Sequence, residues 1–369
     1  MSPSRFDAII VGGGPAGSSC AFALRNAGWR VCIIDKKHFP RDKVCAGWVT
    51  PEVWDLLDIK PADYARDHVL QEIRHFRVGL IGGHAVEFGF EHAVSYGIRR
   101  CEFDAFLARR SKAVLIEGEQ VRKVERVKGI WHINSGCWQA PVLVGAGGHF
   151  CPVARHLGAR TGRFEHAVHA QEIEFQLPPA WRDVIKASCP ELYFCSDLRG
   201  YGWLFRKGNW LNIGLGRQDQ AALGGHVDAF IDWLVAEARL PERPAARMHG
   251  HAYLLASASH RKVVDDGVLL VGDAAGLAYG SSGEGIRPAV ESGLMAARTL
   301  VRCQGDFSQE RLNDYANGLR NRFGRGKMAF DWPVWLVRPW FRLPGFVRHF
   351  VIEKGFLRPG CKLTVARGG

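Results

Sequence analysis

Residues 6–17 read Phe-Asp-Ala-Ile-Ile-Val-Gly-Gly-Gly-Pro-Ala-Gly, and this stretch decides the fold. A short apolar run, rich in β-branched residues, passes directly into a glycine-rich turn. Small and apolar residues follow over 18–26, and Gly28 ends that run. Residues 30–34 form a second apolar run, which Asp35 terminates. The order of strand, GxGxxG turn, helix, strand and acidic residue predicts the βαβ unit of a dinucleotide-binding fold.

Each glycine of the turn has a separate task in such a unit. Gly12 permits the tight turn, Gly14 lets the backbone approach a pyrophosphate, and Gly17 lets helix and strand pack closely. The N-terminus of the helix offers backbone N–H groups and a positive dipole to the phosphates. Asp35 is placed to bind a pair of ribose hydroxyls. The unit by itself does not distinguish FAD from NAD.

A second glycine-rich segment, residues 272–286, reads Gly-Asp-Ala-Ala-Gly-Leu-Ala-Tyr-Gly-Ser-Ser-Gly-Glu-Gly-Ile. It follows a strand-like run at 267–271. The carboxylate of Asp273 can accept hydrogen bonds from cofactor hydroxyls. A helix that begins after Gly285 can direct backbone N–H groups at a bound flavin ring. We therefore expect one FAD site made from both ends of the chain.

The pattern between these segments indicates a second kind of sheet. A buried strand over 141–145 runs into a glycine turn and is expected to abut the cofactor. Residues 73–90 and 161–259 contain alternating strand-like runs, typical of an antiparallel sheet with half-buried strands. The predicted fold class is α/β: a Rossmann-like FAD-binding domain of the glutathione reductase type, an inserted antiparallel-sheet substrate domain and a helical C-terminal tail. The expected boundaries are 1–72, 98–160 and 260–300 for the FAD-binding domain, 73–97 and 161–259 for the substrate domain, and 301–369 for the basic and aromatic tail.

Composition excludes several other classes of protein. The 369 residues suffice for two domains with a sizeable core. Ten cysteines occur without a CxxC pair, which argues against zinc or iron–sulfur sites and favours a reducing compartment. A strand pattern that starts at Phe6 leaves no room for a signal peptide, so the expected location is cytoplasmic. No HExxH motif is present and no metal site is expected; His166, His169, His249 and His251 are interpreted as core or surface residues.

Five segments, in a specific order over about residues 6–300, resemble the geranylgeranyl reductase family of FAD-dependent oxidoreductases, within the para-hydroxybenzoate hydroxylase-like superfamily. The segments are Gly12–Gly17 with Asp35, residues 39–47 with Cys45, Arg100 with Phe103 and Asp104, the Tyr-Gly-Trp-Leu-Phe run at 201–205, and Gly272-Asp273 with Gly283–Ile286. The resemblance implies FAD as cofactor and the reduction of alkene bonds in an isoprenoid or another lipid by hydride transfer from reduced flavin. It implies NAD(P)H or a ferredoxin-like carrier as electron donor.

The resemblance also implies roles for individual residues. Cys45 is the candidate proton donor or redox-sensitive group beside the flavin, and the alternative of an ordinary buried cysteine stays open. Tyr201 and Trp203 alternate along one strand, so both can face an apolar cavity, although ordinary core aromatics remain the alternative. Glu284 is given no catalytic role. The expected cofactor-binding residues are Gly12, Gly14, Pro15, Ala16, Gly17, Asp35, Lys36, Arg41, Cys45, Ala46, Gly47, Arg100, Val121, Gly145, Ala146, Gly272, Asp273, Gly283, Glu284, Gly285 and Ile286.

Three positions depart from the related patterns. Ala46 stands where the family often has glycine, and Arg206 replaces a proline, which would place a charge near the cavity mouth. Gly147 stands where the hydroxylases carry an aspartate, which weakens the case for a pyridine-nucleotide donor. An FAD-dependent monooxygenase or halogenase on the same scaffold is the alternative function, although the Trp-x-Trp-x-Ile-Pro segment usual in halogenases is absent. A flavin-binding electron-transfer protein is a further alternative.

The positive charge is concentrated in the tail. Residues 320–369 contain eleven Lys and Arg and two acidic residues, against a net charge of +12 for the chain. Over 323–356 aromatic residues interleave with basic ones, and the segment lacks the roughly 18 consecutive apolar residues of a membrane span. One interpretation is a helical lid with a solvated basic face. The other, which we favour for a lipid substrate, is a peripheral contact with an anionic membrane at its inner face. No nucleic-acid partner is expected, because no recognised binding fold accompanies the charge.

Overall fold

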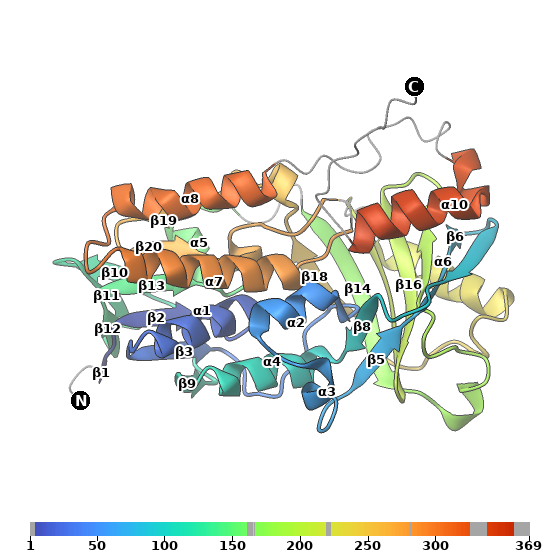
Figure 1. Cartoon of the computed structure of the whole chain (residues 1–369), viewed down its shortest axis with the longest axis horizontal. Helices are drawn as coiled ribbons and strands as arrows, with labels where there is room; N and C mark the ends of the chain where they lie inside the picture. Colours follow the sequence, from blue (N-terminus) through green and yellow to red (C-terminus); the bar gives the residue numbers. More distant parts are fainter. Residues whose placement is uncertain are drawn as a thin grey trace.

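We describe the protein from a computed structural model that covers residues 4–160, 165, 167–218, 223–280, 282–324 and 338–357. The βαβ unit consists of β2 (Ala8–Val11), α1 (Pro15–Asn26) and β3 (Val31–Asp35) (Figure 1). β2 and β3 are parallel neighbours, as predicted. The helix begins at Pro15 rather than Ser18, with Gly14 as its N-cap. Proline suits the first helical position because its missing N–H costs no hydrogen bond there.

A six-stranded sheet contains this unit, in the order β19-β20-β13-β2-β3-β9. Every neighbouring pair is parallel except β19 and β20. The chain leaves β2 and β20 at the same edge of the sheet, so both glycine-rich segments start there. The four strands outside the βαβ unit are β9 (Val114–Glu117), β13 (Val142–Gly145), β19 (Val264–Asp265) and β20 (Val268–Leu270).

Helices α1 and α7 (Ile286–Arg302) cross at close range on this sheet (Figure 1). A Cβ atom at Gly293 of α7 would lie 2.2 Å from the backbone oxygen of Ala16, so a larger residue cannot occupy this crossing without displacement. The Gly272 N–H donates a hydrogen bond of 2.9 Å to Ser292 Oγ on the same helix. The crossing therefore holds the second glycine-rich segment against the first. Helix α8 (Gln309–Phe323) packs beside α7.

A seven-stranded sheet follows the order β18-β14-β17-β16-β15-β6-β7. Its neighbouring pairs are antiparallel, as predicted, except that β15 and β6 are parallel. Helix α6 (Leu223–Ala236), which the sequence analysis did not anticipate, packs its apolar side chains against one face. The strands are β6 (His75–Leu80), β7 (Ala85–Gly89), β14 (Val168–Gln176), β15 (Glu191–Phe194), β16 (Gly200–Lys207), β17 (Trp210–Arg217) and β18 (His249–Tyr253).

Shorter elements connect the two large sheets. Arg99 is the N-cap of α4 (Arg100–Arg110), and Arg100 is the first residue of that helix. Phe103 and Leu107 of this helix are buried, whereas Phe106 is half-buried. The remaining strands are β1 (Ser4–Arg5), β10 (Val124–Val127), β11 (Ile130–Ile133) and β12 (Trp138–Ala140) in one sheet, and β4 (Trp48–Val49), β5 (Leu70–Ile73) and β8 (Ser95–Ile98) in another. The remaining helices of this part are α2 (Pro51–Leu57), α3 (Pro61–Tyr64), α4 (Arg100–Arg110) and α5 (Pro152–His156).

The segment 338–357 of the tail lies against the other face of the seven-stranded sheet. It forms η4 (Arg338–Arg342), α10 (Pro344–Phe346) and η5 (Val347–Leu357). Five apolar side chains are buried in the cluster of β6, β15 and β16: Phe341, Val347, Val351, Ile352 and Phe356. Others remain exposed, namely Trp340, Leu343 and Phe350. The predicted tail aromatics Phe330, Trp332 and Trp335 lie outside the described residues.

Within the described ranges, every helix is too short or too polar to cross a membrane.

Candidate cofactor and substrate site

A cavity of about 570 Å³ is lined by residues of both large sheets and of both glycine-rich segments. Most of the predicted site residues contribute to its wall. Four predicted glycines do not, namely Gly17, Gly47, Gly145 and Gly272. At each of these four, a Cβ atom would lie within 3 Å of a neighbouring atom, so they allow close packing behind the wall. The predicted residues that line the cavity are Gly12, Gly14, Pro15, Ala16, Asp35, Lys36, Arg41, Cys45, Ala46, Arg100, Val121, Ala146, Tyr201, Trp203, Asp273, Gly283, Glu284, Gly285 and Ile286.

The first glycine-rich turn offers bare backbone to the cavity. Gly12 has a φ of +109°, and a Cβ atom there would lie 2.4 Å from the Ala146 oxygen. At Gly14 an added Cβ atom would meet only the Arg41 guanidinium, at 3.7 Å. The Gly13 N–H donates to Asp35 Oδ2 at 2.9 Å, which fixes the turn against the end of β3. This cradle fits a pyrophosphate at the N-terminus of α1.

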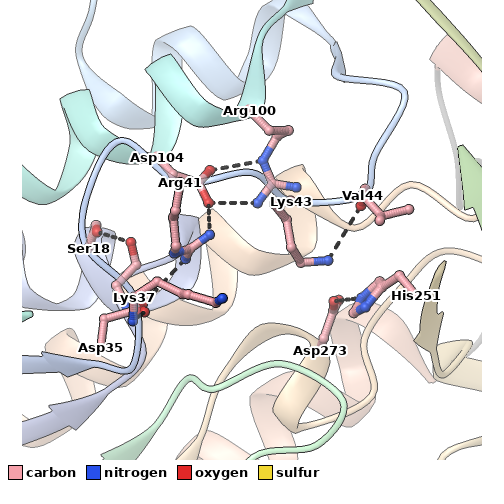
Figure 2. Close-up of polar contacts among 11 residues, drawn as sticks. Ser18, Asp35, Lys37, Arg41, Lys43, Val44, Arg100, Asp104, His251 and Asp273 are labelled. Atoms are coloured by element: carbon pink, nitrogen blue, oxygen red, sulfur yellow. Dashed lines mark hydrogen bonds and ion pairs between the residues drawn. The ribbon is translucent and has the colours of Figure 1, made fainter. Parts of the chain in front are cut away.

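A buried network of alternating charges holds two arginines at the cavity (Figure 2). Asp104 accepts two hydrogen bonds from Arg100, at 2.9 and 3.0 Å, and one from Arg41 at 3.1 Å. Arg41 also lies 3.4 Å from Asp35. Burial alone would lower the pKa of Arg100, but Asp104 and the facing Cys45 thiol raise it, so the guanidinium stays charged. Both arginines can therefore bind phosphate or other acceptor oxygens of a cofactor.

Asp273 lies opposite this network, beside His251 and Lys43 (Figure 2). Burial raises the pKa of Asp273, yet His251 at 3.5 Å and the charges of Lys43 and Arg100 bring it down to about 2. Burial also lowers the pKa of Lys43 and of His251. Asp273 is therefore a charged acceptor, suited to cofactor hydroxyls. His251, which the sequence analysis interpreted as a core or surface residue, belongs to the site. Its position in β18 matches no binding motif, so the sequence did not indicate this role.

The Cys45 loop is fixed to the seven-stranded sheet by side chains that sequence reasoning missed. The Cys45 N–H donates to Glu172 Oε1 at 2.6 Å, and Asn212 Nδ2 donates to the Cys45 oxygen at 3.4 Å. Lys207, which is fully buried, donates to the Ala46 oxygen at 3.0 Å and pairs with Glu174. Burial raises the pKa of Glu172 to about 6. These polar residues lie in the region predicted to form the antiparallel sheet and belong to no motif. Their role is visible only in the folded sheet, which places them beside the Cys45 loop.

The other end of the cavity is aromatic. Tyr201, Trp203 and Phe205 share one face of β16 and line the cavity, as the strand alternation predicts for the first two. Trp48 and Phe356 stack there with ring centroids 5.3 Å apart. The polar atoms of two rings are already bonded, because the Tyr201 hydroxyl donates to the Ser282 oxygen and the Trp203 indole to Asn212, each at 2.6 Å. The rings thus present apolar surface to a ligand.

The expectation that Arg206 places a charge near the cavity mouth is wrong. The same alternation that turns Tyr201 and Phe205 inward turns Arg206 to the opposite face of the sheet. Its guanidinium donates to the backbone oxygens of Arg182 and Ile185, both at 2.8 Å, and it does not line the cavity. The proline-to-arginine departure therefore does not alter this wall.

The geometry defines a class of protein, and comparison with known proteins agrees. Residues 7–96 match the family described as FAD dependent oxidoreductase. A menaquinone reductase of Mycobacterium tuberculosis is 30% identical over 350 residues, covering 87% of this chain and 81% of that protein. A digeranylgeranylglycerophospholipid reductase of Methanocaldococcus jannaschii is 26% identical, covering 84% and 81%. The crystal structure of a geranylgeranyl bacteriochlorophyll reductase-like protein of Thermoplasma acidophilum superposes with a TM-score of 0.75 at 21% identity, covering 93% of this chain and 89% of that one.

The protein is therefore an FAD-dependent oxidoreductase with a mixed α/β fold. More narrowly, the chain belongs to the geranylgeranyl reductase family of these flavoproteins, as its five motifs predict.

Proposed function

We propose that the protein reduces alkene bonds of an isoprenoid or another lipid by hydride transfer from reduced flavin. The observation that carries this proposal is the composition of the cavity. Its polar end contains both glycine-rich segments and the arginine network, whereas its other end is walled by Tyr201, Trp203, Phe205, Trp48 and Phe356. An apolar chain suits the aromatic end, and relatives named for isoprenoid lipids support that substrate class.

The wall residues suggest how the chain would hold FAD, which supplies the hydride when reduced. The turn at Gly12–Gly17 would bind the pyrophosphate, Asp35 a ribose, and Asp273 the hydroxyls of the ribityl chain. The N-terminus of α7, after Gly285, would place backbone N–H groups at the flavin ring. Cys45 and the aromatic side chains would position the alkene and exclude water from it.

We also propose the domain division expected from the sequence. The FAD-binding domain comprises residues 1–72, 98–160 and 260–300, the substrate domain 73–97 and 161–259, and the tail 301–369. Sheet membership supports this division. β6 and β7 join the later strands of the seven-stranded sheet, although β9 and β13 of the six-stranded sheet lie between them and those strands in the sequence. The three-stranded sheet of β4, β5 and β8 lies at the junction, because its strands come from both sides of the proposed boundaries.

The electron donor and the membrane contact belong to the same proposal. NAD(P)H or a ferredoxin-like carrier would reduce the flavin. The described tail covers the sheet with one side and exposes Trp340, Leu343 and Phe350 on the other, together with Arg342 and Arg348. This pattern suits a peripheral contact with anionic lipid on the cytoplasmic side, where an isoprenoid substrate would be available.

The test is a single-turnover reaction under anaerobic conditions. The flavin-loaded protein, reduced with dithionite, is mixed with polyprenyl lipids, and the products are weighed by mass spectrometry. Products heavier by pairs of hydrogens are expected. Products heavier by oxygen, when air is admitted, would support the monooxygenase alternative instead, and unchanged lipids would contradict both.

A further inference from the structure

Glu284 lines the cavity, and its carboxyl group forms no hydrogen bond with the described residues. Both carboxyl oxygens are buried and have no hydrogen-bond partner among the residues that the structure describes. Backbone hydrogen bonds hold this segment without the carboxyl oxygens. The Glu284 backbone N–H donates to Ser282 Oγ at 3.3 Å, and the Glu284 backbone carbonyl oxygen accepts from the Tyr279 N–H at 2.9 Å. A buried polar group without a partner costs free energy. The backbone N–H of Arg287, in the first turn of α7, interacts with the carboxyl group and lowers its pKa, without the geometry of a full hydrogen bond.

Charged groups on two helices interact electrostatically with Glu284. They are Arg287 and Glu291 of α7 and Glu52 of α2. Arg287 lies 3.7 Å from Glu52, whose side chain is 42% exposed. Glu284 lines the cavity and interacts electrostatically with this partly exposed carboxylate. Glu52 is therefore the group through which we expect Glu284 to exchange protons with solvent.

The other titratable neighbours are phenols. Tyr201 of β16 and Tyr279 of the second glycine-rich segment interact with Glu284 electrostatically. Burial raises the pKa of both phenols far above neutrality. Neither changes charge in the range where a carboxyl group can titrate, so Glu284 is the group of this cluster that responds to pH near neutrality.

We propose that Glu284 donates the proton that completes alkene reduction in this cavity. The proposal rests on the proposed function. The alkene gains a proton from the Glu284 carboxyl, whose O–H bond breaks, and a hydride from the reduced cofactor. The two electrons of the hydride reduce the double bond and leave the cofactor oxidised. The Glu284 carboxylate then takes up a proton from solvent by way of Glu52.

The protonation state of Glu284 suits this role. Burial raises its pKa to about 8, and Glu52 raises it further while Arg287 opposes the shift. The acid is mostly protonated at pH 7 and loses its proton as the pH rises through 8. A proton donor is active only when protonated, so the rate of alkene reduction should fall as the pH rises above 8.

Glu284→Gln separates the proposed role from a structural one. A neutral amide has nearly the shape of the neutral acid, so the variant should fold and bind FAD as the wild type does, but it carries no acidic proton. We expect its single-turnover rate with polyprenyl lipid to fall about 100-fold or more, and its fall in rate above pH 8 to disappear. Glu284→Asp keeps the acid and should restore part of the rate. Glu125→Gln, at an exposed carboxylate paired with Lys123, is the matched control and should behave as wild type.

Two readouts complete the test. Infrared difference spectra should show the carbonyl band of a protonated carboxyl group, which disappears as the pH is raised through 8 and is missing from Glu284→Gln. Glu52→Gln should move the fall in rate to lower pH, because it removes a charge that raises the pKa of Glu284. Wild-type rates and an unchanged pH profile in Glu284→Gln would overturn this inference and leave the proposed function intact. A wild-type protein that reduces no alkene would overturn the proposed function and this inference with it.

Discussion

Asp104 is fully buried and accepts hydrogen bonds from two arginines of the cofactor wall. Its replacement by asparagine would remove a charge while leaving Arg100 buried, which costs about 3–5 kcal/mol when one partner of a buried pair is lost. We expect Asp104→Asn to lower the free energy of unfolding by that order and to weaken FAD binding. Urea unfolding followed by tryptophan fluorescence and titration with FAD would measure the two effects.

The control for this prediction is an acidic residue in an exposed ion pair. Asp63 and Arg66 form such a pair on the surface, with side chains 53% and 76% exposed. Asp63→Asn should change stability by no more than about 0.5 kcal/mol, since exposed pairs contribute little. Equal destabilisation by the two substitutions would show that the arginine network does not depend on Asp104.

Cys45 lies on the loop that Glu172, Asn212 and Lys207 fix to the seven-stranded sheet. Its thiol faces the Arg100 guanidinium. Cys45→Ser should retain FAD and lose most of the turnover, because the backbone contacts persist while the smaller, less polarisable hydroxyl changes the contact at the reacting end. The visible FAD spectrum and the single-turnover rate test this. The fall in rate above pH 8 should remain in Cys45→Ser, in contrast to Glu284→Gln, and an unchanged rate would remove Cys45 from the reaction.

At the scale of whole elements, the crossing of α1 and α7 joins the two halves of the FAD site. Gly293→Ala would put a methyl group 2.2 Å from the Ala16 backbone oxygen. The helices must then separate, which should cost about 1–3 kcal/mol and weaken FAD binding, because Gly272 moves with α7. Gly224→Ala on α6 is the matched control, since its added Cβ atom would meet nothing within 4 Å. It should leave stability unchanged or slightly raised. Equal thermal midpoints of the two loaded variants would contradict the argument.

The same elements show which parts of the fold and of the site could be predicted from the sequence. The βαβ unit follows from local signals, the apolar run, the glycine spacing and Asp35, so it was predicted nearly to the residue. The parallel pair of β15 and β6 was missed because the register between distant strands is set by tertiary packing rather than by alternation. His251, Glu172 and Lys207 carry no local motif. Only the approach of the two sheets brings His251 to the cavity and the other two to the Cys45 loop. Arg206 was misplaced because the family motif was read without the strand alternation.

At the scale of the whole molecule, the tail has one side that packs on the protein, as in a lid, and an outer side that we propose contacts a membrane. Phe356 reaches the cavity and stacks on Trp48, so part of the tail closes the aromatic end. The outer side of the same segment exposes Trp340 and Phe350 beside Arg342 and Arg348. A lid with this outer surface could lie on a membrane and cover the substrate cavity at once, which would let a lipid pass from the bilayer into the cavity without crossing water.

This arrangement predicts membrane binding that depends on the outer basic residues. Each basic side chain near an anionic surface contributes about 1 kcal/mol, so replacing both Arg342 and Arg348 with glutamine should weaken binding to phosphatidylglycerol-containing vesicles roughly 30-fold. Sedimentation of the flavin-loaded protein with vesicles measures it, and binding should fall with added salt. Glutamine at the exposed Arg66 and Arg311 removes the same charge elsewhere and should leave binding unchanged. If the two double variants bind vesicles alike, the outer face of the tail is solvated and the segment acts as a lid alone.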